Sequence, residues 1–151
     1  MHDLYKQVGL LALMLAGLTL GARLVYSPFS AGEVGDEAPM LIQSERSRML
    51  LDAGREAIFR FKLAEAESTF TMLAALPDGK AAAAFHLETI SLLKLIALDK
   101  EVHFDEFLAR SDALREVLEE EPASTWQAFL EAEAYLHRAI ARSKRGQYLR
   151  A

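Results

Sequence analysis

The sequence predicts an all-α protein: an N-terminal hydrophobic helix followed by about five helices packed as antiparallel pairs. From residue 40 onward the apolar residues recur at spacings of three and four, which is the period of an α-helix. Strand signals are missing there, because the chain has neither alternating apolar and polar runs nor clusters of β-branched residues. Prolines and short polar breaks separate the periodic segments, and short connections force neighbouring helices to run antiparallel.

Composition excludes several classes of protein before any motif is considered. A length of 151 residues suits one soluble domain with a short targeting segment, and an apolar fraction of 52% is enough for a core. The absence of cysteine excludes disulfides, thiolate metal sites, a cysteine nucleophile and a lipoprotein anchor. The formal net charge of −5 argues against binding to nucleic acid.

Residues 1–26 are predicted to be a signal anchor or a signal peptide. The run from Val8 to Ala22, VGLLALMLAGLTLGA, carries no charge, whereas a helix of a soluble domain shows polar positions every three or four residues. Residues 4–26 reach the length of about 20 that spans a bilayer if Lys6 and Arg23 extend to the two interfaces. A cleaved signal peptide stays open as the alternative, because the run also fits the apolar core of such a peptide.

Charges around this segment predict its orientation. Lys6 precedes it, and Glu33, Asp36 and Glu37 follow, which favours an N-terminus inside the cytoplasm. We therefore expect an inner-membrane protein with its domain facing the periplasm, or a secreted or periplasmic protein if the segment is cleaved. Residues 27–40 combine proline, glycine, serine and acidic residues, and they are expected to form a flexible linker.

The first two helices are predicted over residues 41–60 and 63–76. Ser44 offers an N-cap for the first, and Pro77 with the glycine at 79 ends the second. Their apolar faces are formed by Met49, Leu50, Ala53, Ala57, Ile58 and Phe61 in the first helix and by Leu63, Ala66, Phe70 and Leu73 in the second.

Three further helices are predicted, over 80–98, 104–120 and 123–145. A polar break at 99–103 separates the first two of these, and Pro122 ends the second. Ser124 is a candidate cap for the last, with Gln127 three residues on as its partner in a capping box. Tyr148 is expected to open one more helix.

Two stretches resemble the tetratricopeptide repeat, in which small residues let paired helices approach closely, an aromatic fills the gap and a proline ends the second helix. They are Leu63, Ala66, Phe70, Leu73 and Pro77 in one stretch and Ala139, Gly146, Tyr148 and Ala151 in the other, with a looser copy over 104–122. The spacing departs from the family, since Pro77 and Pro122 are 122 − 77 = 45 residues apart and the usual period is about 34. The resemblance implies a helix-pair repeat domain over 41–151 that continues beyond Ala151.

The resemblance also implies a binding surface. In helix-pair repeats the successive first helices line a concave face that holds a peptide or helix of a partner. The lining is expected to come from polar positions on the third and fifth helices, and Lys94, Arg138 and Arg142 are the candidates. Trp126 is a further candidate if it is exposed, because tryptophan is a natural anchor for a partner; a core position is the alternative.

Signals for catalysis or metal binding are weak. His86 is expected to be exposed or half-buried, with Glu88 on a different face of the helix. Glu133 and His137, four residues apart, are expected to form a local hydrogen bond. Glycine-rich phosphate loops, nucleophile elbows and H-E-x-x-H motifs do not occur. We therefore expect no catalytic residue, no cofactor and no metal.

Together these observations predict a non-catalytic adaptor or scaffold of the cell envelope. Its partner is expected to be a protein or peptide, with membrane contact through residues 4–26 and no nucleic acid. Two alternatives stay open: a structural helical membrane protein that self-associates, and a helical-bundle enzyme or ligand binder.

Overall fold

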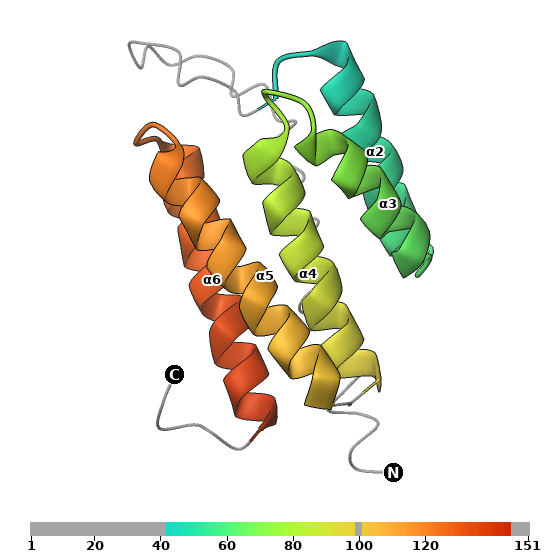
Figure 1. The fold of residues 1–151 in the computed structure, drawn as a ribbon, viewed down its shortest axis with the longest axis vertical. Helices are drawn as coiled ribbons and strands as arrows, with labels where there is room; N and C mark the ends of the chain where they lie inside the picture. The colour runs from blue at the N-terminus through green and yellow to red at the C-terminus, as the bar shows by residue number, and fades with distance from the viewer. Residues whose placement is uncertain (1–41, 99–100, 146–151) are drawn as a thin grey trace, which may run out of the picture. The chain divides into compact units, whose positions relative to one another are not determined.

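The computed structural model describes residues 42–98 and 101–145, and the regular structure in these ranges is entirely α-helical. The helices are α2 (Glu45–Phe59), α3 (Leu63–Ala74), α4 (Lys80–Leu98), α5 (Glu101–Glu120) and α6 (Thr125–Lys144), shown in Figure 1. The predictions of an all-α fold and of about five helices are confirmed for this part of the chain. The predicted N-terminal helix, the linker and the helix opening at Tyr148 lie outside the described residues.

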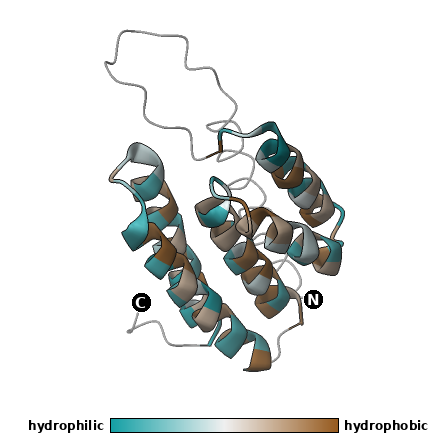
Figure 2. Cartoon of the chain, turned by 45° about the horizontal axis from the view of Figure 1, so that its top comes forward, coloured by the Kyte–Doolittle hydropathy of each residue, from teal (hydrophilic) through white to brown (hydrophobic). Residues whose placement is uncertain are grey.

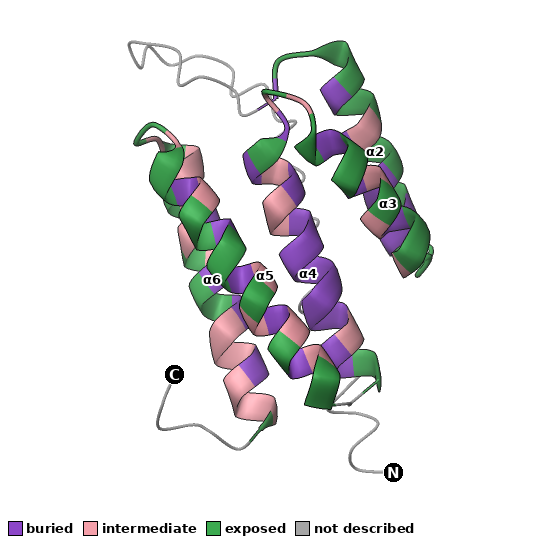
Figure 3. Ribbon diagram, in the orientation of Figure 1, coloured by how far each residue is buried: buried purple, intermediate pink, exposed green. Residues whose placement is uncertain are grey.

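Helix α4 lies at the centre of the bundle. It contacts α2, α3, α5 and α6, while α2 packs along α3 and α6 packs along α5. Consecutive helices run in opposite directions (Figure 1). Figure 3 shows buried residues along most of α4, and Figure 2 shows hydrophilic residues on the outward faces of the surrounding helices.

The core follows from this arrangement. The largest apolar side chains that are fully buried belong to three helices: Phe70 and Leu73 of α3, Ile90 and Leu92 of α4, and Phe107, Leu114 and Leu118 of α5. Helix α6 adds Leu130 and the small residues Ala134 and Ala141. Among the described helices, α4 is also the one that is long and apolar enough to cross a membrane, and 67% of its apolar window is buried inside the bundle. Its composition is therefore explained by its central position.

A glycine sets the closest approach of α2 and α3. A Cβ added at Gly54 would lie 2.5 Å from Cζ of Phe70, so only glycine fits against the edge of this ring. Phe70 is fully buried and stacks on His86 of α4, with 4.6 Å between the ring centroids. Gly54 thus allows the Phe70 ring to fill the space shared by three helices.

The turn between α2 and α3 contains no glycine. Phe61 takes a left-handed conformation there, with φ of 57°. Its N–H donates to the carbonyl of Ile58, and the N–H of Lys62 donates to the carbonyl of Ala57. This is the hydrogen-bond pattern of a Schellman C-cap, and a bulky residue at its left-handed position costs stability that glycine would not.

Asp78 ties the turn before α4 to the start of α2. Its carboxylate accepts hydrogen bonds from the backbone N–H of Gln43 at 2.9 Å and of Ser44 at 2.7 Å, and from the hydroxyl of Ser47 at 2.5 Å. These bonds, led by the backbone N–H of Ser44, lower the pKa of Asp78 well below its ordinary value. Ser44 also caps α2, as predicted, by accepting from the backbone N–H of Ser47.

Two details of the predicted helix boundaries were wrong. The break expected over 99–103 is shorter, because α5 already begins at Glu101, an acidic residue that suits the positive end of a helix. Ser124 caps α6 by accepting from the backbone N–H of Gln127. The Gln127 side chain does not complete the capping box; it donates to the carbonyl of Leu118 instead.

We expect Gly54→Ala to destabilise the protein. Alanine gains about 1 kcal/mol of helix propensity over glycine, but the new methyl group would overpack against Phe70, at a typical cost of about 1–3 kcal/mol. Urea unfolding of the full chain, followed by far-UV circular dichroism, measures the difference. In a Phe70→Leu background the same substitution should cost less, and a Gly54→Ala protein more stable than wild type would contradict this packing.

We expect Asp78→Asn to cost about 1 kcal/mol at neutral pH, since hydrogen bonds to a partly exposed carboxylate are screened by solvent. Because the pKa of Asp78 is lower in the folded chain, its contribution is present above the unfolded value of about 4 and is lost as the pH falls. The difference in unfolding free energy between wild type and variant should therefore shrink between pH 6 and pH 3. A difference that stays constant over this range would show that the charge is not involved.

Candidate functional site

Lys94 lies inside a network of charged side chains rather than on an open surface. Its ammonium group is 3.0 Å from carboxylate oxygens of both Glu67 on α3 and Glu106 on α5, and its side chain is 19% exposed. Arg110 adds a contact of 3.2 Å to Glu67, and His103 lies 3.3 Å from Glu106. The network joins three helices, so it holds α3, α4 and α5 in register.

The network shifts the pKa values of Lys94 and Glu106. Burial disfavours the charge of Lys94, but the hydrogen bonds that Lys94 donates to Glu67 and Glu106 outweigh it and raise the pKa of Lys94. Burial likewise opposes the charge of Glu106, and the hydrogen bonds from Lys94 and His103 outweigh it and lower the pKa of Glu106. Both groups are therefore charged at neutral pH, and the charge of Lys94 is already matched within the fold.

The other predicted binding residues, Arg138, Arg142 and Trp126, lie on α6. Arg138 is mostly buried, and its guanidinium group lies 2.9 Å from the carboxylate of Asp112 on α5. Arg142 and Trp126 are half-buried, and the indole of Trp126 packs edge-on against Phe129 with 6.0 Å between the ring centroids. Lys94 differs from these residues in that its ammonium group is engaged by Glu67 of α3 and Glu106 of α5.

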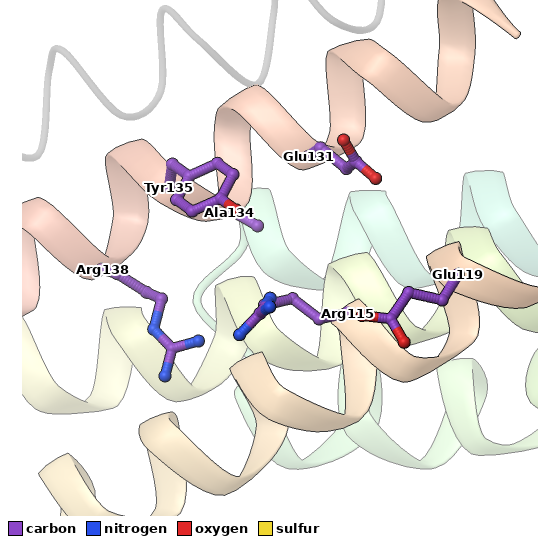
Figure 4. Close-up of a pocket in the computed structure, with 6 residues that line it drawn as sticks. All are labelled: Arg115, Glu119, Glu131, Ala134, Tyr135 and Arg138. Carbon is purple, nitrogen blue, oxygen red and sulfur yellow. The ribbon is translucent and has the colours of Figure 1, made fainter. Parts of the chain in front are cut away.

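A small pocket lies between α5 and α6 near Arg138 (Figure 4). Its volume is about 100 Å³, and its lining consists of Arg115, Glu119, Glu131, Ala134, Tyr135 and Arg138. Sequence reasoning found only Arg138 of this set. The sequence pattern could have indicated Tyr135, because this aromatic residue falls on the polar face of α6; in the structure it is 62% exposed. Arg115 could not be found, because only the crossing of two helices brings it to Arg138.

A buried pair of polar residues lies on the inner side of α6. Nδ1 of His137 is 2.6 Å from Oε2 of Glu88 on α4, and the Glu88 side chain is completely buried. The predicted partner of His137 was wrong: Glu133 is 3.8 Å from Nε2 of His137, too far for a hydrogen bond. Glu88 is the partner because it projects from α4 towards α6, a contact across 49 residues of sequence.

The Glu88–His137 pair is a structural link and not an open reaction centre. Burial raises the pKa of Glu88, and the hydrogen bond and charge of His137 offset this only in part. The pair is closed to solvent, since His137 is 6% exposed and Phe85 stacks on its ring at 5.8 Å. A substrate would have to displace the packing between α4 and α6 to reach it.

His86 is buried, which corrects the expectation of an exposed or half-buried ring. It lies between Phe70 and Phe85, and burial, with a smaller effect of the Arg55 charge, lowers the pKa of His86 to about 3. It is therefore neutral at physiological pH and serves as a flat core residue. Within the described ranges, no group of three or more His, Asp or Glu side chains is arranged to hold a metal ion.

Comparison of the chain with protein-family models, with curated proteins and with solved structures returned no match.

We expect His137→Phe to destabilise the protein by about 3–5 kcal/mol at neutral pH, because it leaves the carboxyl group of Glu88 buried without its hydrogen-bond partner. The pKa of Glu88 is raised in the folded chain, so burial of the charged carboxylate costs stability at high pH. This cost falls as the pH drops below the folded pKa towards the unfolded value of about 4, because the buried carboxyl group takes up a proton. Urea unfolding between pH 7.5 and pH 4.5 measures both effects.

Two variants control for this experiment. The double variant Glu88→Leu with His137→Phe should recover most of the stability, because apolar residues of similar size can replace a buried pair. His103→Phe removes the partly exposed histidine beside Glu106 and should cost less than about 1 kcal/mol. Equal losses for His137→Phe and His103→Phe would exclude a special role for the buried pair.

Proposed function

We propose that the chain is a non-catalytic protein–protein interaction module, built from tetratricopeptide-like helix pairs and held in the cell envelope through residues 4–26. The observation that carries the proposal is the outer face of α6. Tyr135 and Leu136 on this face are 62% and 53% exposed, although both are large side chains with apolar surface. Exposed aromatic and aliphatic residues on a rigid helix are typical of binding surfaces.

The order of packing supports a helix-pair repeat. Helix α2 pairs with α3 and α4 with α5, and the first helices of these pairs contact each other and α6 in the order α2, α4, α6. These helices begin at residues 45, 80 and 125, so the intervals are 80 − 45 = 35 and 125 − 80 = 45 residues. The first interval is close to the period of about 34 in the tetratricopeptide repeat.

The contacts of the first pair support the same assignment. Ala66 and Phe70 of α3 have the Ala-x-x-x-Phe spacing of the repeat, and both are fully buried. Gly54 of α2 allows the Phe70 ring to pack against the helix backbone. A small residue facing an aromatic side chain across paired helices is the packing that this repeat uses.

The proposed place in the cell envelope depends on the apolar segment at 4–26, because α4 is enclosed by other helices and does not face outward. An enzyme is the less favoured alternative, since the pair of Glu88 and His137 is buried, with Phe85 stacked on the His137 ring. A self-associating membrane protein is the second alternative. It is less favoured because α4, the most apolar of the described helices, is covered by other helices and offers no exposed apolar face for association.

Chemical crosslinking of the full chain in membranes of its native host tests the proposal. We expect the wild-type chain to capture a defined protein partner reproducibly, and a Tyr135→Ser, Leu136→Ser variant to lose it. The matched control is Met49→Ser, which removes an apolar side chain that is 66% exposed on α2. Capture only of further copies of the chain would favour the self-associating alternative, and no capture would exclude the adaptor function.

A further inference from the structure

The pocket between α5 and α6 carries opposite charges at its two ends. We name it the α5–α6 groove and define it by Arg115 and Glu119 of α5 and by Glu131, Tyr135 and Arg138 of α6. Figure 4 shows the arginines together towards one end and the glutamates towards the other. This separation follows from the antiparallel course of the helices, because the arginine precedes the glutamate on α5 and follows it on α6.

The positive end brings two guanidinium groups towards each other. In Figure 4 the side chains of Arg115 and Arg138 point towards one another from the two helices. Arg138 is matched by Asp112 at 2.9 Å, whereas Arg115 is exposed and makes no ion pair or hydrogen bond with the rest of the described chain. An anion placed between two like charges relieves their repulsion and can accept hydrogen bonds from both guanidinium groups.

The negative end shows the same feature with the opposite sign. Glu119 is exposed and has no ion-pair partner among the described residues, and Glu131 accepts only a hydrogen bond of 3.3 Å from the Gln127 amide. Arg115 and Glu119 are four residues apart, which is about 6 Å along a helix axis. The two ends of the groove are therefore separated by about one helical turn on α5, and by about two turns on α6, where Glu131 and Arg138 are seven residues apart.

We propose that the α5–α6 groove binds a helix of a protein partner that carries an acidic residue and, one turn away, a basic residue. The acidic side chain lies between Arg115 and Arg138, and the basic side chain lies between Glu119 and Glu131. The ring of Tyr135, at the edge of the groove, covers the apolar part of the bound helix. This inference rests on the proposed function and specifies the surface and the chemistry of the partner.

The charge pattern separates this occupant from simpler ones. A small anion would be attracted by the two arginines but repelled by the two glutamates nearby. A metal cation would be attracted by the glutamates and repelled by the arginines. A helix with charges of both signs at a spacing of four residues matches both ends at once. Such charge matching across a solvent-exposed surface selects the partner and its register more than it adds affinity.

Fluorescence anisotropy with labelled, blocked peptides tests the proposal on the full chain. The probe is (EAAAK)₃, a helical peptide with acidic and basic residues four apart, and its controls are (QAAAK)₃ and (EAAAQ)₃. We expect the wild-type chain to bind (EAAAK)₃ at least tenfold more tightly than either control. Arg115→Gln should remove this preference, while Arg46→Gln should leave it unchanged, because Arg46 is an exposed arginine of α2 and lies outside the groove.

A change of charge in the groove should change its preference. In the double variant Glu119→Lys, Glu131→Gln both ends become positive, so we expect this variant to prefer (EAAAE)₃ over (EAAAK)₃. Equal binding of (EAAAK)₃ by wild type and Arg115→Gln, equal binding of the three peptides by wild type, or binding of acetate without binding of peptide would each overturn the proposal.

The crosslinking experiment distinguishes failure of this inference from failure of the proposed function. If wild type and Arg115→Gln capture the same partner equally well, the chain is an adaptor that uses another surface. If the wild type captures no partner, the proposed function itself is wrong.

Discussion

The burial of α4 is the constraint on which the rest of the structure depends. This helix is apolar on nearly every face, and it can be removed from water only if other helices cover it on all sides. The pair α2–α3 covers one side, and α5 with α6 covers the other. The loops are short, so each helix can reach its place only as an antiparallel neighbour of the one before it.

Polar groups then determine how the helices align. A purely apolar core would permit several registers of α6 along α4, whereas a fully buried carboxylate permits only those that bring it a partner. The Glu88–His137 contact provides this selection in the core. The network around Lys94 and the carboxylate of Asp78 provide it at the edges, by joining α3, α4 and α5 and by joining the turn before α4 to the start of α2.

The surface differs from the core in that its charges are incompletely matched within the chain. Around Lys94 each charge has a partner on a neighbouring helix, and the network is explained by folding alone. In the α5–α6 groove Arg115 and Glu119 have no such partners among the described residues, and the exposed ring of Tyr135 lies beside them on α6. A surface that combines unmatched charge with exposed aromatic area is better suited to contact with another protein than to isolation in water.

The sequence by itself determined the class of the fold, the positions of the helices and their caps. These features depend on residues within one or two turns of each other, as in the capping of α2 by Ser44 and of α6 by Ser124. Only the tertiary structure decided that His137 pairs with Glu88 rather than with Glu133, that Lys94 is matched within the fold, and that Arg115 and Arg138 line the same pocket. Each of these arrangements joins different helices. Which side chains come together there depends on how the helices pack and cross, and periodicity along a single helix does not contain that information.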